Sequence, residues 1–124
     1  MPLSSARPER RIVLCIDDDE VALRVRKLLL GSAGYEVLTA SSGESGLEIL
    51  RDNPVDAVIA DHFLSAKTGT EIAREMKELK PAVPILIVSA TAEKPAGLEF
   101  ADGFLPKGEA PDVLLAKVAQ LLNP

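Results

Sequence analysis

The stretch IVLCIDDD, at residues 12–19, decides the fold, because an apolar run of strand length ends there in three aspartates. An apolar run of this length, bounded by polar residues, predicts a strand. Four apolar residues then recur at helical spacing, on one face of a predicted helix: Val21, Val25, Leu28 and Leu29. This helix is expected to end near Gly31 and Gly34, since helices commonly stop at glycine.

Four further stretches are predicted to be strands: residues 35–40, 55–60, 85–88 and 103–105. The run at residues 85–88 is the most apolar, which predicts a strand buried on both faces, as in a parallel sheet. Pro106 follows the shortest stretch and has no N–H to donate, so we expect that strand at a sheet edge.

Amphipathic stretches separate the predicted strands. Ser41 and Glu44 have the spacing of a capping box, which predicts a helix that Pro54 ends. Three apolar residues share one face of the next predicted helix: Ile72, Met76 and Leu79. Residues 92–100 contain proline and glycine, which predicts a short or irregular helix there. Pro111 is expected in the first turn of a last helix, where proline is tolerated.

The alternation of strands and helices indicates an α/β protein. It predicts a parallel sheet with right-handed crossovers and helices on both faces. A doubly wound five-stranded sheet of order 2-1-3-4-5 suits a chain of 124 residues. We expect one domain over residues 11–124, preceded by a flexible arm at residues 1–10.

The composition excludes several classes of protein. Aromatic residues are 3% of the chain and the net charge is −5, which argues against direct nucleic-acid binding. The single cysteine, Cys15, lies in an apolar run and suits a reducing cytoplasm. No apolar segment is long enough to span a membrane, and the start of the chain lacks the apolar core of a signal peptide. The sequence therefore predicts a cytoplasmic protein without membrane association.

Reactive side chains fall where the predicted strands end: Asp17, Asp18, Asp61, Ser89 and Lys107. Ligands of open parallel sheets bind beyond the carboxyl ends of the strands, and strands one and three are neighbours in this order. Three carboxylates are therefore expected to meet there and to need a cation. Oxygen ligands favour a hard ion such as Mg²⁺, and a carboxylate can attack phosphorus to form an acyl phosphate.

Five segments, in the same order along the chain, resemble the successive signatures of response-regulator receiver domains of two-component systems: residues 13–19, 34–37, 61–69, 87–90 and 104–107. The resemblance covers the chain from about Arg11 to Leu122. It implies a flavodoxin-like (βα)5 fold and a signalling domain rather than an enzyme.

The resemblance also implies roles for the acidic cluster. Asp61 would be the phosphoacceptor, with Mg²⁺ as the cofactor. Asp18 would bind the metal directly, Asp17 would bind it through water, and the backbone carbonyl of Phe63 would complete the protein's share of the ligands. Lys107 would pair with the phosphoryl oxygens.

Two further residues carry roles implied by the resemblance. Ser89 would be the switch hydroxyl that moves toward the phosphoryl group, and Phe104 would be the aromatic residue whose rotamer follows. The implied partners are a sensor histidine kinase or a histidine phosphotransfer protein, and an unidentified downstream protein or output domain. Whether the chain is a stand-alone receiver or is part of a longer protein is left open.

The chain departs from the family pattern at several positions. Ser65 stands where proline is usual, with no expected loss of chemistry. Gly108 stands where receivers usually have a proline in a cis peptide, so we predict a trans Lys107–Gly108 bond or a re-routed loop. The segment between Ser89 and Lys107 is short, which predicts a reduced fourth helix and puts the usual output face in doubt.

His62 is expected to be an exposed neighbour of the phosphoacceptor.

Two other functions remain as alternatives. A pseudo-receiver would bind proteins without being phosphorylated. A phosphatase of the haloacid-dehalogenase type would use Asp17 as the nucleophile and Asp19 as the acid/base, reading residues 17–21 as D-x-D-x-V. That enzyme needs a further acidic motif after the lysine, for which only Glu109 and Asp112 are available.

Overall fold

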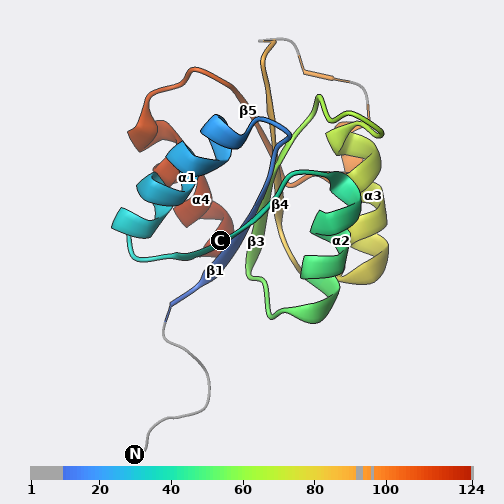
Figure 1. Ribbon diagram of the computed structural model, residues 1–124, viewed down its shortest axis with the longest axis horizontal. Helices are drawn as coiled ribbons and strands as arrows, with labels where there is room; N and C mark the ends of the chain where they lie inside the picture. The colour runs from blue at the N-terminus through green and yellow to red at the C-terminus, as the bar shows by residue number, and fades with distance from the viewer. Residues whose placement is uncertain (1–9, 92–93, 96, 124) are drawn as a thin grey trace, which may run out of the picture.

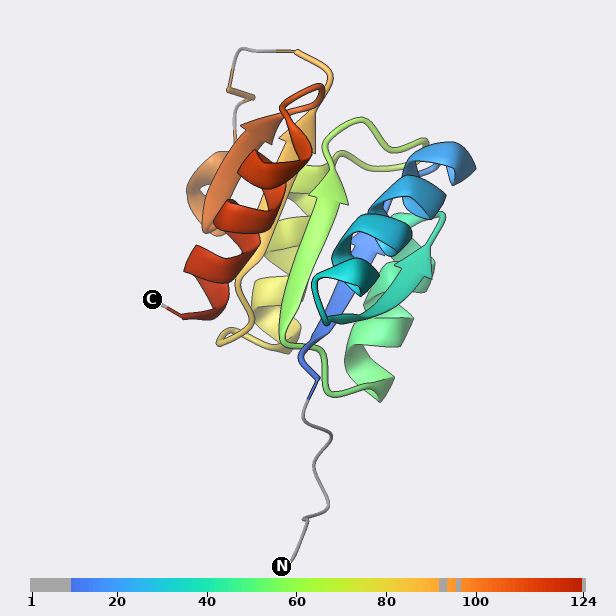
Figure 2. The same cartoon turned by 90° about the vertical axis from the view of Figure 1, so that its left-hand side faces the viewer.

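The computed structural model describes residues 10–91, 94–95 and 97–123. A five-stranded parallel sheet of order β2-β1-β3-β4-β5 lies between two layers of helices, as Figures 1 and 2 show. The elements are β1 Ile12–Ile16, α1 Glu20–Ser32, β2 Glu36–Ala40, α2 Gly43–Asp52, β3 Ala57–Asp61, α3 Gly69–Leu79, β4 Ile85–Ser89, a 3-10 helix η1 Leu98–Phe100, β5 Gly103–Pro106 and α4 Pro111–Leu122. The predicted strand order is confirmed.

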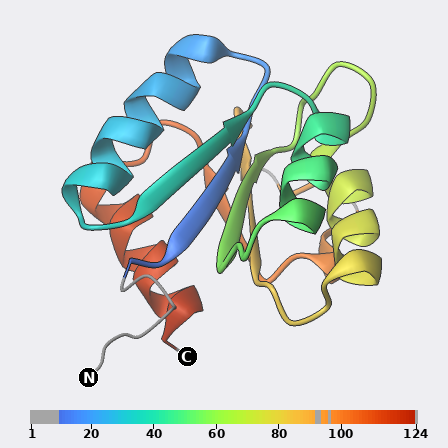
Figure 3. The same cartoon turned by 60° about the horizontal axis from the view of Figure 1, so that its bottom comes forward.

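Two apolar layers hold the helices against the sheet. Figure 3 shows α1 and α4 on one face of the sheet and α2 and α3 on the other. Alternate residues of a strand point to opposite faces. In β1, Leu14 and Ile16 therefore pack toward α2 and α3, while Val13 and Cys15 pack toward α1 and α4. All five residues of β1, of β3 and of β4 are buried, as the continuous apolar run of β4 predicts. Burial raises the pKa of the Cys15 thiol to about 12, so this thiol stays protonated.

The apolar face predicted for helix α1 is not the face that packs on the sheet. Val21, Val25 and Leu28 are 65%, 57% and 72% exposed. The buried residues are instead Leu23, Arg26 and Leu30, which also have helical spacing. The helix is rotated about its axis so that the second set faces the sheet. An arginine is accepted on that face because an aspartate lies opposite it.

The predicted capping box at Ser41 and Glu44 is wrong. Ser42 caps α2, and its hydroxyl accepts from the backbone N–H of Ser45. Glu44 is then the second helical residue, whereas a reciprocal box needs the third. A complete capping box begins α3, where Thr68 accepts from the Glu71 amide and the Glu71 carboxylate accepts from the Thr68 amide.

The connection between β4 and β5 is reduced, as predicted. In its described residues the only helical element is η1, of 3 residues. Strand β5 lies at the sheet edge, as Pro106 predicts, and Pro111 begins α4. The described chain contains no cis peptide bond, so the Lys107–Gly108 bond is trans as expected, and Gly108 has a φ of +92°. That value lies in the left-handed region, which glycine enters without steric penalty.

Two expectations concern the ends and the surface of the domain. The predicted arm at residues 1–10 lies outside the described residues except for Arg10, which is exposed. Among the residues that the structure describes, no helix has the length and apolar character that crossing a membrane requires.

Candidate functional site

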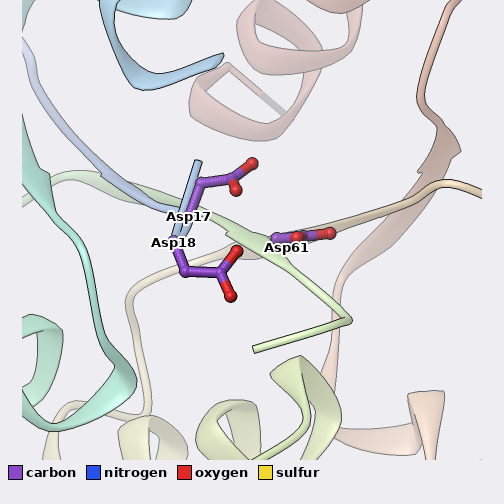
Figure 4. A group of neighbouring side chains, drawn as sticks. All are labelled: Asp17, Asp18 and Asp61. Carbon is purple, nitrogen blue, oxygen red and sulfur yellow. The ribbon is translucent and has the colours of Figure 1, made fainter. Parts of the chain in front are cut away.

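The site lies at the carboxyl edge of the sheet, where β1 and β3 end side by side (Figure 4). Asp17 and Asp18 directly follow β1, and Asp61 is the last residue of β3. One carboxylate oxygen from each of the three lies within 4.8 Å of the others. The predicted convergence of these carboxylates is therefore observed, and it results from the parallel pairing of two strands far apart in the sequence.

Asp17 is the fixed anchor of this cluster, with no exposed surface. Its Oδ1 accepts from the Asp19 backbone N–H at 2.9 Å. Its Oδ2 accepts from Arg26 Nη1 at 3.1 Å and from Lys107 Nζ at 3.0 Å. Because both oxygens are engaged, Asp17 is poorly placed to act as a nucleophile. Asp19, the acid/base of the phosphatase alternative, caps α1 through Val21.

Lys107 connects two of the carboxylates. Its Nζ lies 3.0 Å from Asp17 Oδ2 and 3.3 Å from Asp61 Oδ2. The backbone holds the residue in place, since the Lys107 N–H donates to the Ser89 carbonyl at 2.6 Å across the β4–β5 pair. A single ammonium group therefore spans the ends of β1 and β3 from the edge strand.

Asp61 has one oxygen available for chemistry. The residue is 4% exposed, and its Oδ1 is buried without a hydrogen-bond partner among the described residues. Burial raises the pKa of the Asp61 carboxyl above its ordinary value, and the negative charge of Asp17 raises it further, while the Lys107 ammonium opposes both. An unsatisfied buried carboxylate oxygen beside other carboxylates suits a cation ligand or a nucleophile.

This raised pKa predicts a pH-dependent stability difference between the protein and Asp61→Asn. The folded state binds the Asp61 proton more tightly than the unfolded chain does, so stability falls as pH rises from about 3.8 through the raised value. Asparagine removes this loss, and we therefore expect the metal-free variant to gain stability relative to wild type as pH rises to neutral. Urea unfolding in chelator across this pH range measures it. A difference that does not grow with pH would contradict the expectation.

Asp18 differs from its two neighbours because its side chain is exposed. Its Oδ2 accepts from the Ser65 hydroxyl at 3.0 Å, across the turn that follows β3. Phe63 belongs to the same turn, which a bridge between Phe63 and Thr68 closes. Ser65, at the position where the family pattern has proline, thus supports an acidic residue of the site. The role of the Phe63 carbonyl stays a prediction.

Ser89 ends β4, the strand that pairs with β3, and Phe104 lies on the next strand, β5. Ser89 is fully buried at the end of β4, and its hydroxyl lies 3.2 Å from Thr91 Oγ1. Phe104 is half-buried and packs on the apolar layer of α2 and α3. The His62 ring is half-buried rather than exposed, and it lies edge-on to the Phe63 ring with centroids 4.9 Å apart.

Arg26 is the site residue that sequence reasoning missed. It is 8% exposed and reaches Asp17 from the middle of α1. The sequence does contain a signal, because Arg26 lies three residues after Leu23 and four before Leu30. Strand alternation also directs Asp17, like Cys15, toward the face that α1 covers.

Known proteins similar to this chain point to one family. The family model described as "Response regulator receiver domain" matches residues 13–119. The response regulator MprA of Mycobacterium sp. (strain KMS) is 33% identical over 115 residues, which cover 90% of this chain and 50% of MprA. The alkaline phosphatase synthesis transcriptional regulatory protein PhoP of Bacillus subtilis is 32% identical over 90% of this chain and 48% of PhoP. The chain thus spans about half the length of the curated relatives it matches.

Solved structures share the fold closely. A putative response regulator from Chloroflexus aurantiacus has a TM-score of 0.88 and 32% identity, over 94% of this chain and 100% of its own. The response regulator TrrA from Thermotoga maritima, solved in complex with Mg(2+)-BeF, has a TM-score of 0.86 and 29% identity, over 90% of this chain and 99% of its own.

Proposed function

Because this chain belongs to the response regulator receiver domain family, we propose that it accepts a phosphoryl group on Asp61. The donor would be a phosphohistidine of a sensor histidine kinase or of a histidine phosphotransfer protein. The observation that carries the proposal is the buried Oδ1 of Asp61, which has no partner among the described residues and lies in a cluster with two acidic groups and one ammonium group. The product, an aspartyl phosphate, would change which protein or output domain the receiver contacts.

The residues divide the chemistry between them. An Asp61 carboxylate oxygen forms a bond to phosphorus while the bond from phosphorus to the donor imidazole nitrogen breaks, and that nitrogen takes up a proton. Lys107 Nζ, 3.3 Å from Asp61 Oδ2, offsets negative charge on the transferring group. The Asp19 backbone N–H and Arg26 hold the Asp17 carboxylate in place. Asp17 Oδ2 accepts in turn from Lys107, which keeps the ammonium group within reach of Asp61.

The donor set fits a hard divalent cation, and we propose Mg²⁺. Three carboxylates within 4.8 Å repel one another, and oxygen ligands match magnesium's preference. Asp18 and Asp61 would hold the ion directly, with Asp17 acting through water and the Phe63 carbonyl as a further ligand. When bound, the ion would neutralise negative charge on the phosphoryl group.

We propose that Ser89 and Phe104 transmit the modification. The Ser89 hydroxyl now lies beside Thr91, and an anionic phosphoryl group on Asp61 offers it a stronger acceptor. Phe104 lies on the neighbouring edge strand, β5. It packs against the apolar cluster beneath α2 and α3, and residues of η1 pack against this cluster too. Movement of Ser89 would free space for a rotamer change of Phe104, which a downstream partner would detect.

Intact mass tests the proposal most directly. The protein is incubated with Mg²⁺ and acetyl phosphate, with Asp61→Asn as the control that lacks the nucleophile, and beryllofluoride binding is measured in parallel. We expect a Mg²⁺-dependent gain of one phosphoryl group that the control does not show. Failure of both phosphoryl transfer and beryllofluoride binding in the wild-type protein would refute the proposal and favour the pseudo-receiver alternative.

A further inference from the structure

A second cation, Arg26, contacts the acidic cluster that we propose as the Mg²⁺ site. The Arg26 side chain is 10% exposed, and its Nη1 lies 3.1 Å from Asp17 Oδ2, the oxygen that Lys107 also contacts. Burying a guanidinium is unfavourable unless a charge partner compensates it. Asp17, with no exposed surface, is that partner.

The two cations of the site differ in what they contact. Lys107 is shared between Asp17 and Asp61, whereas the ion pair of Arg26 is with Asp17. Arg26 approaches from α1 and Lys107 from the end of β5, so they reach Asp17 from different elements. A change at Asp61 can therefore draw Lys107 away while Arg26 stays in place.

We propose that Arg26 is a positioning residue that keeps Asp17 ion-paired when Lys107 turns to the phosphoryl group, and that it favours the anion over the metal. This inference rests on the proposed function. Without Arg26, a move of Lys107 would leave the fully buried Asp17 carboxylate with no direct ion-pair partner among the described side chains, so Lys107 would be held back at Asp17. With Arg26 the carboxylate keeps its partner, and Lys107 is free to pair with phosphoryl oxygens.

The charge of Arg26 gives the inference its measurable signature. A fixed positive charge close to the three carboxylates repels a divalent cation and attracts a phosphoryl anion or its analogue. Removal of this charge should shift the two affinities in opposite directions. A loss of structure would weaken both.

The test compares Arg26→Met, which retains chain length without charge, with Arg26→Lys, which restores the charge. The matched control is Arg24→Met, because Arg24 is an exposed arginine on the same helix. Titration calorimetry measures Mg²⁺ alone and then beryllofluoride at saturating Mg²⁺, and circular dichroism checks folding. We expect Arg26→Met to bind Mg²⁺ at least about tenfold more tightly and beryllofluoride more weakly by on the order of tenfold, because Coulomb's law gives effects of this size over several ångströms even at a dielectric close to that of water. Arg26→Lys should approach wild type, and Arg24→Met should equal it.

The outcomes separate the inference from the proposed function. Wild-type protein that binds neither Mg²⁺ nor beryllofluoride contradicts the proposed function. Wild-type binding of both, with a folded Arg26→Met whose affinities are unchanged or weaken together, overturns the role of Arg26 alone. If Arg26→Met does not fold, Arg26→Gln takes its place, since its amide can still donate to Asp17, and the same opposed shifts are required.

Discussion

Lys107→Met is expected to slow phosphoryl transfer to Asp61 by about 10²- to 10³-fold, the usual effect of removing one preorganised charge-stabilising donor. Lys107 Nζ lies 3.3 Å from Asp61 Oδ2 and is the nearest described cation to the phosphoacceptor. The variant should fold, because Arg26 keeps its ion pair with Asp17 at 3.1 Å. The rate of phosphoryl gain from acetyl phosphate at saturating Mg²⁺, followed by intact mass, gives the measurement.

Two variants control this experiment. Lys27→Met removes an exposed lysine from α1 and should leave the rate unchanged. Lys107→Arg retains the charge but changes its geometry, and it should recover part of the rate. A Lys107→Met protein that reacts at the wild-type rate would show that the ammonium group serves only to neutralise Asp17.

Gly69→Ala is expected to destabilise the protein by more than about 3 kcal/mol, which is above the usual range for point substitutions. A Cβ at Gly69 would overlap the Asp61 carbonyl oxygen and would lie 2.9 Å from both the Asp61 carbonyl carbon and the His62 Cα. These are backbone atoms that no rotamer change can move. The β3–α3 turn must therefore shift, and it carries the phosphoacceptor with it. Urea unfolding measures the loss, and beryllofluoride binding should weaken in the fraction that stays folded.

Gly31→Ala is the matched control for this prediction. A Cβ at Gly31 meets nothing within 4 Å, and the residue lies inside α1. Alanine favours helix over glycine, so we expect this variant to be more stable than wild type by about 0.5–1 kcal/mol. If Gly69→Ala instead stayed within 1 kcal/mol of wild type, the turn after Asp61 would have to be far more adaptable than its close approach to α3 indicates.

Local signals in the sequence determined the framework of this domain. Apolar runs located β1, β3 and β4, and Pro106 assigned the fifth strand to the sheet edge, as observed. The acidic cluster also followed from the sequence, because the carboxyl ends of adjacent parallel strands must meet. Gly108 predicted a trans bond after Lys107, since only a proline makes the cis form inexpensive.

The tertiary structure alone decided how the site is electrostatically completed. Val21 and Val25 have helical spacing, and so do the buried residues Leu23 and Leu30. Because both sets fit the helical period equally well, periodicity could not assign the buried face of α1. The choice depends on what lies opposite the helix. Asp17, at the end of a buried strand, has both oxygens paired, and Arg26 is one of its partners. An ion pair between a strand end and a helix face depends on rotation and register across the sheet, and these are set by packing rather than by any local pattern.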